Sequence, residues 1–67
     1  MIGKRYQHYK GGIYEVVELA RDANNFMKVL VIYKSEENGN VWARNLEEWD
    51  DHVRQSSGDI VKRFTAI

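Results

Sequence analysis

Residues 26–44 read FMKVLVIYKSEENGNVWAR, which is a long strand-like run, a turn signal and a second strand-like run. Val, Ile, Tyr and Phe dominate the runs, and these side chains suit a pleated, half-buried surface. Between them, Asn38-Gly39 is the strongest short-range hairpin signal, because this pair adopts positive φ readily. Residues 29–33 are apolar at every position, which predicts a central strand covered on both faces.

Two further turn signals lie upstream of this hairpin. Gly11-Gly12 reaches positive φ without steric cost, and Asn24-Asn25 is a weaker form of the same device. Three turns imply four strands, and the runs between the turns have strand composition. These four runs are residues 5–9, 13–20, 26–34 and 41–44.

The pattern changes after Arg44. Leu46, Trp49 and Val53 recur at helical spacing, which places them on one helical face. Asn45 followed three residues later by Glu48 is typical of an N-cap with a capping-box partner. The sequence therefore predicts a short helix of about two turns over residues 45–53.

A polar loop at 55–59 and a last strand at 60–64 complete the chain. Four meandering strands, a helical turn and a fifth strand form the element order of an SH3-like barrel. We therefore expect a mostly β fold, a small five-stranded SH3-like barrel with one short helical turn between strands 4 and 5. It should form a single domain over residues 1–67, because this length accommodates one modest core.

Composition excludes several classes of protein. The chain has no cysteine, so disulfides and thiolate chemistry are absent. It has no apolar run near the roughly 20 residues that span a bilayer, and we expect a soluble, cytoplasmic protein with no membrane partner. The net charge is zero, which argues against a nonspecific polyanion binder, although residues 1–12 are basic and residues 46–59 are acidic.

The first candidate site surrounds the glycine turn and contains Tyr6, His8, Tyr9, Lys10 and Tyr14. Aromatic faces interleaved with cations could stack bases or clamp a phosphate backbone. The structural alternative is that these side chains tile one face of a barrel with their polar tips in water. The glycines lack the spacing of a phosphate-binding loop and precede no helix.

The second candidate is Trp42 with Arg44, which share a face if the strand alternates. A guanidinium beside an indole could hold a planar or anionic ligand. Alternatively, Trp42 fills the core and Arg44 extends over it, while the helical register assigns Trp49 to the core. Neither histidine has a triad or metal-ligand spacing, and the acidic run lacks the spacing of a calcium loop, so we predict no catalytic residue, metal or cofactor.

A pattern of aromatic and basic residues runs through nearly the whole chain: Tyr6-x-His8-Tyr9-Lys10-Gly11-x-x-Tyr14-x-Val16, Ala20-Arg21, Val31-x-Tyr33, Trp42-x-Arg44-x-Leu46 and Arg63-Phe64. It resembles the DUF1653 family of small bacterial and phage domains, which implies an SH3-like architecture and an uncharacterised activity. The chain departs from the family where residues 22–25 replace His-Ser-Glu-Thr, and where Asn45 and Lys62 each replace a proline. The first and fourth blocks are intact, so any ligand site is expected there.

These features favour a noncatalytic binding module with an aromatic-basic face. Its partner is a protein segment or a nucleic acid, and the zero net charge favours protein. The alternative is a small enzyme or enzyme accessory for a nucleotide-like or other anionic molecule, with a histidine base and an arginine clamp. A third possibility is an oligomerising element, and the oligomeric state is left open. The face consists of Tyr6, His8, Tyr9, Lys10, Tyr14, Trp42, Arg44 and Arg63.

Overall fold

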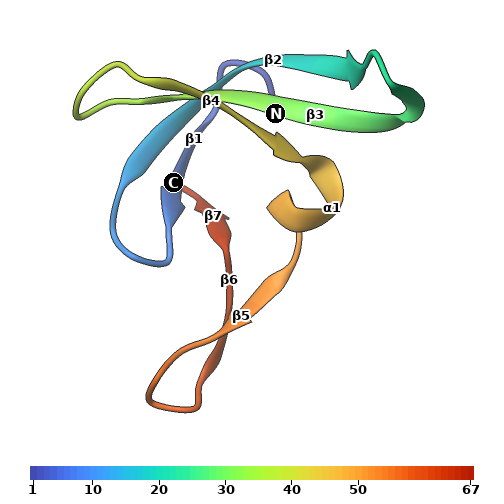
Figure 1. Cartoon of the computed structure of the whole chain (residues 1–67). Helices are drawn as coiled ribbons and strands as arrows, with labels where there is room; N and C mark the ends of the chain where they lie inside the picture. Colours follow the sequence, from blue (N-terminus) through green and yellow to red (C-terminus); the bar gives the residue numbers. More distant parts are fainter.

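The computed structural model describes all 67 residues, which form a mostly β structure with one helical turn (Figure 1). The helix α1 spans Leu46–Trp49 and follows the fourth strand. The seven strands are β1 (Arg5–His8), β2 (Ile13–Asp22), β3 (Asn25–Ser35), β4 (Val41–Asn45), β5 (His52–Arg54), β6 (Ile60–Lys62) and β7 (Phe64–Ala66). No helix has the length and apolar character needed to cross a bilayer.

Five strands form one antiparallel sheet in the order β4-β3-β2-β1-β7, while β5 and β6 form a separate two-stranded sheet. Figure 1 shows this second sheet as an arm that extends away from the first. The expected five-stranded barrel is wrong in two respects, because there are seven strands and the sheet does not close. Both β4 and β7 remain edge strands, since no bonds join them to each other or to the arm.

The three upstream turns lie where the sequence predicts them. Gly39 and Gly11 adopt φ values of 74° and 108°, which a residue with a Cβ rarely reaches. At the second turn, the Asp22 carboxylate accepts a hydrogen bond from the Asn24 backbone N–H at 2.8 Å. The glycines and the short polar side chain therefore set the three hairpin connections.

The predicted helix over residues 45–53 is too long. It ends at Trp49, and His52–Arg54 instead forms β5. Val53 pairs with Val61 across the arm, so its helical spacing from Trp49 was coincidental. Gly58 closes this hairpin with a φ of 93°, and a bend at Arg63 divides the expected fifth strand into β6 and β7.

Asn45 caps α1 as predicted, because its side-chain oxygen accepts a hydrogen bond from the Glu47 backbone N–H at 3.0 Å. The reciprocal half of the predicted capping box does not form. Glu48 instead accepts a hydrogen bond from Arg44. The cap therefore rests on the asparagine alone.

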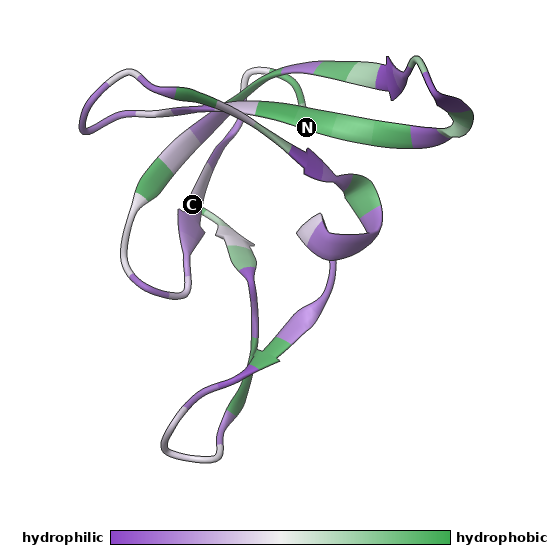
Figure 2. Cartoon of the chain, in the orientation of Figure 1, coloured by the Kyte–Doolittle hydropathy of each residue, from purple (hydrophilic) through white to green (hydrophobic).

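The core lies between one face of the large sheet and α1. Figure 2 shows hydrophobic colouring along most of β3, yet only one face of that strand is buried. Val31 and Tyr33 are buried, whereas Leu30 and Ile32 on the other face are half-buried. The expectation of a strand covered on both faces is wrong, because the only helix packs on one side. The core residues are Val16, Val31, Tyr33, Trp49 and Phe64.

Candidate functional site

A network of six rings occupies the inner face of the sheet. Antiparallel register aligns Tyr6 with Tyr14 and His8 with Phe64, so these four side chains share that face. The His8 ring lies 5.0 Å from Phe64 and 6.4 Å from Tyr14, both edge-to-face. The network continues through Tyr33 to Trp49 and places His8 at its exposed end.

His8 is held as a neutral hydrogen-bond donor. Its Nδ1 accepts a hydrogen bond from the Lys10 backbone N–H at 3.1 Å, which leaves the ring proton on Nε2. Partial burial lowers the pKa of His8, and the positive charges of Arg44, Arg63 and Lys10 lower it further. A neutral ring whose acceptor nitrogen is already occupied presents Nε2–H to a ligand, and it is poorly suited to remove a proton.

Tyr9 and Lys10 extend this surface beyond the sheet. The Tyr9 ring lies 4.5 Å from the His8 ring at a tilt of 36°. The Lys10 ammonium lies 5.8 Å from the centroid of the Tyr9 ring, within the range of a cation–π contact. The β1–β2 turn therefore presents two adjacent rings and one exposed cation.

Arg44 is fixed at the inner end of the network. Its Nε donates to the Tyr33 hydroxyl at 3.2 Å, and its Nη1 donates to a Glu48 carboxylate oxygen at 3.3 Å. The guanidinium carbon lies 5.9 Å from the Phe64 ring centroid. A phenol, a carboxylate and a ring therefore hold this cation in place.

Arg63 binds Asp51 through two parallel hydrogen bonds. Nε and Nη2 donate to the two carboxylate oxygens at 2.8 and 3.2 Å. The guanidinium lowers the pKa of Asp51 through these bonds, and Asp51 in turn raises the pKa of Arg63. The pair joins the two ends of the β5–β6 arm, because Asp51 precedes β5 and Arg63 follows β6.

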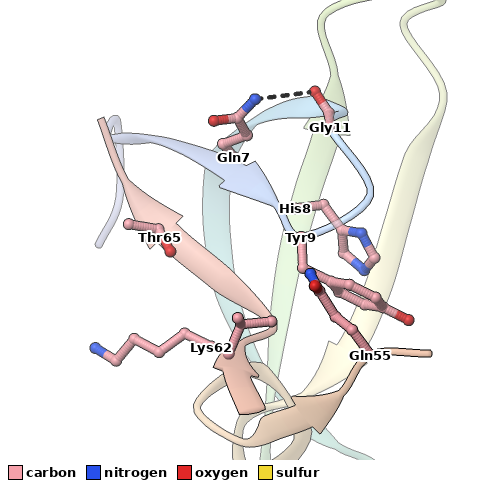
Figure 3. Close-up of a pocket in the computed structure, with 8 residues that line it drawn as sticks. Gln7, His8, Tyr9, Gly11, Gln55, Lys62 and Thr65 are labelled. Atoms are coloured by element: carbon pink, nitrogen blue, oxygen red, sulfur yellow. Dashed lines mark hydrogen bonds between the residues drawn. The ribbon is translucent and has the colours of Figure 1, made fainter. Parts of the chain in front are cut away.

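A hollow of about 260 Å³ opens beside His8 (Figure 3). Gln7 and Thr65 lie on one side of it, and His8 and Tyr9 lie on the other. The Gln7 side chain donates to the Gly11 carbonyl at 3.4 Å. Polar and apolar groups both line it. The lining residues are Gln7, His8, Tyr9, Gly11, Gln55, Val61, Lys62 and Thr65.

Most of the residues predicted for the aromatic-basic face come together. His8 and Tyr9 line the hollow. The positive charges of Lys10, Arg44 and Arg63 lower the pKa of His8, and the Lys10 ammonium also lies over the Tyr9 ring. Tyr14 contacts His8 from β2. We name this set the His8 surface: His8, Tyr9, Lys10, Tyr14, Arg44 and Arg63.

Two predicted residues lie outside the His8 surface. Tyr6 packs edge-to-face on Trp49 at 5.3 Å and belongs with the core. Trp42 lies on β4, which β3 and β2 separate from β1. It shares a face with Arg44, as the alternation predicts, but it is 52% exposed and fills no part of the core. Trp49 fills that place instead.

Sequence reasoning missed much of the hollow. Gln7 and Thr65 meet because β1 pairs with β7, a contact between the two ends of the chain. Gln55, Val61 and Lys62 come from the arm, part of which was predicted to be helical. Val61 and Lys62 lie within the last strand that the sequence predicts over residues 60–64, but no local signal indicated that this strand would lie beside Gln7 and His8.

The structure contains no cluster of three or more His, Asp or Glu side chains that could hold a metal ion. Glu48 and Asp51, in the acidic run, instead bind arginines. Asp50 and Glu47 are exposed. The run therefore serves partly to neutralise the arginines of the His8 surface.

A family model described as "Protein of unknown function (DUF1653)" matches residues 4–66. A solved structure, the crystal structure of a protein belonging to DUF1653 from Bordetella bronchiseptica, is 27% identical to this chain. It aligns over 100% of this chain and 87% of its own length with a TM-score of 0.84. No curated protein matches the sequence.

Proposed function

The chain belongs to the DUF1653 family. From the geometry of its site we propose that it is a noncatalytic binding module whose His8 surface and adjoining hollow hold a segment of another protein. The supporting observation is the position of His8. The same residue forms the exposed end of the aromatic network and a wall of the hollow, and its Nε2–H makes no hydrogen bond within the chain.

The chemistry of this region suits a polypeptide. Gln7, Gln55 and Thr65 offer donors and acceptors that match backbone amides, and Tyr9 offers a ring for an apolar or proline side chain. A hollow of about 260 Å³ has room for one side chain of such a segment. The segment would lie across the turn, with that side chain in the hollow.

The charge balance favours protein over nucleic acid. Arg44 and Arg63 each bind a carboxylate, so little of their charge is available for phosphates. Lys10 is the uncompensated cation of the His8 surface, and the chain has zero net charge. A nucleic-acid groove needs a clear excess of positive charge.

The module has an SH3-like architecture left open at its edges, and it acts in the cytoplasm of a bacterium. The lack of cysteine suits a reducing compartment. The donor state of His8 favours binding over the proton transfer that an enzyme with a histidine base requires.

A display experiment tests the proposal. The full chain is immobilised and a random library of linear 12-residue peptides is selected on it; we expect an enriched motif that binds with a micromolar Kd. Tyr9→Ala and Lys10→Ala should each weaken the selected peptide about tenfold, the usual effect of losing a ring or a charge at a binding centre. Phe26→Ala is the matched control, because Phe26 is 72% exposed and lies on the distant β2–β3 hairpin.

The outcomes separate the possible partners. Peptides whose binding is unaffected by the Tyr9 and Lys10 substitutions would place the site elsewhere and contradict the proposal. Failure to enrich any motif, together with steeply salt-dependent binding of a 20-nucleotide single-stranded DNA, would favour nucleic acid instead.

A further inference from the structure

The outer edge of β4 is an open edge of the main sheet. Backbone Ser35 N–H donates to Asn40 C=O at 2.9 Å, and the β3–β4 register continues through the pairs Tyr33↔Trp42 and Val31↔Arg44. In an antiparallel ladder, hydrogen-bonded pairs recur at every second residue. The N–H and C=O groups of Trp42 and Arg44 therefore point toward β3. The N–H groups of the alternate residues Val41, Ala43 and Asn45 point outward, with no strand beside them, as do the C=O groups of Val41 and Ala43. The Asn45 C=O is already the first acceptor of α1.

This edge lacks the usual protection against pairing. Proteins block free edges with proline, lysine, bulges or very short strands. β4 has five residues, no proline, no lysine and no register shift, and its side chains Val41 and Trp42 are 59% and 52% exposed. The opposite edge strand, β7, has only three residues. An undefended edge that carries an exposed indole is suited to a strand partner.

We propose that β4 pairs with β4 of a second copy of this chain, antiparallel and with Ala43 on the twofold axis, so that two sheets become one. In this register the outward-facing residues 41, 43 and 45 lie opposite 45, 43 and 41 of the other copy. The Ala43 pair can exchange two hydrogen bonds, and each outer pair can make one, from the Asn45 N–H to the Val41 C=O, because the Asn45 C=O is already bonded within α1.

The register is self-complementary in its side chains. Trp42 of each copy lies opposite Arg44 of the other at a non-hydrogen-bonded pair, where side chains approach most closely. The Arg44 side chain is fixed by Tyr33 and Glu48 but is still 27% exposed, so its guanidinium can accept an indole. Moving the axis one residue toward α1 would instead place Arg44 opposite Arg44. Zero net charge adds no long-range repulsion between copies.

Dimerisation in this form leaves the hollow free. Arg44 is the one member of the His8 surface that it uses, whereas His8 and Tyr9 lie on and after β1, which β3 and β2 separate from β4. The dimer would therefore carry two hollows on one sheet, and the peptide-binding test with Tyr9→Ala and Lys10→Ala does not touch its interface.

Sedimentation equilibrium of the full chain from about 1 µM to 1 mM tests the inference, and we expect a monomer–dimer equilibrium. Ala43→Pro should raise the dimer Kd about tenfold or more, because it removes an outward N–H from the twofold pair while the β3–β4 ladder stays intact. Ala66→Pro is the matched control. The bonds Tyr9 N–H to Arg63 C=O and Ile67 N–H to Arg5 C=O place the Ala66 N–H outward on the other edge.

A second variant covers the case in which the proline prevents folding. Ala43→Lys places two like charges across the axis, so it should weaken the dimer at low salt and recover at high salt, whereas Ala66→Lys should do neither. A chain that stays monomeric at all concentrations overturns the inference. So does a dimer that tolerates both Ala43 variants, since its interface would lie elsewhere.

Discussion

The indole of Trp49 lies flat on the ring of Phe64, with centroids 3.7 Å apart and an interplanar angle of 10°. Both residues are buried, at 3% and 5% exposure, and they come from α1 and β7. This contact joins the only helix to the last strand of the sheet. The stack therefore holds α1 against β7, two elements that no backbone hydrogen bond joins.

Trp49→Ala should lower the free energy of unfolding by about 3–5 kcal/mol, the usual cost of removing a large aromatic side chain from a core. In a domain of this size that loss approaches the whole stability. Urea denaturation followed by circular dichroism measures it, with Phe26→Ala as an exposed aromatic control expected within about 0.5 kcal/mol of wild type. A small effect of Trp49→Ala would show that the stack contributes little.

Asn45→Ala should destabilise the protein by about 1 kcal/mol, because the Glu47 backbone N–H loses its partner. Asn45→Asp should retain most of the stability, since a carboxylate also accepts this bond and suits the helix start. Asn40→Ala, in the exposed β3–β4 turn, is the control. Equal urea midpoints for Asn45→Ala and wild type would contradict the capping role.

His8 should titrate below about pH 6.5, the value of an unperturbed histidine. Because the folded pKa is lowered, His8 contributes stability above about pH 6.5, and this contribution is lost as the pH falls through the folded pKa. NMR of the ring protons gives the titration, and the ring nitrogen shifts should show the proton on Nε2 at neutral pH. The same histidine in urea-unfolded protein is the reference. A folded pKa above that of the unfolded protein would contradict the proposed environment.

Asp51→Asn should destabilise the protein near neutral pH by removing the charge that binds Arg63. The folded pKa of Asp51 is lowered, so its contribution is present above about pH 4 and is lost as the pH falls through the folded value. The urea midpoints of wild type and variant should therefore converge on acidification. Asp50→Asn, at an exposed carboxylate with no arginine partner, should follow wild type at every pH.

The parts of the fold that the sequence predicts are those set by neighbouring residues. Asn38-Gly39 and Gly11-Gly12 give turns because of their own backbone freedom, and Asn45 caps the helix through a bond to a residue two positions away. The four upstream strands accordingly lie within two residues of the predicted bounds. Family membership, carried by the aromatic and basic blocks, is also confirmed.

The errors arise where distant residues decide the structure. Val53 has the spacing of a helical residue from Trp49, but its pairing with Val61 across the Gly58 turn makes it a strand. Closure of the barrel requires one edge strand to pair with the other, which strand composition does not reveal. The hollow escaped prediction for the same reason, since Gln7 meets Thr65 only through the pairing of the two chain ends.

The arm formed by β5 and β6 gives the hollow an unusual property. A two-stranded hairpin is marginally stable by itself, and this one contacts the rest of the chain mainly at its base, where Arg63 meets Asp51. Its amides should exchange with solvent through local opening, well before those of the main sheet. Gln55, Val61 and Lys62 belong to this segment, so we expect one wall of the hollow to open while the core stays folded. The width of the hollow should therefore adjust to the proposed peptide at little cost to the stability of the sheet.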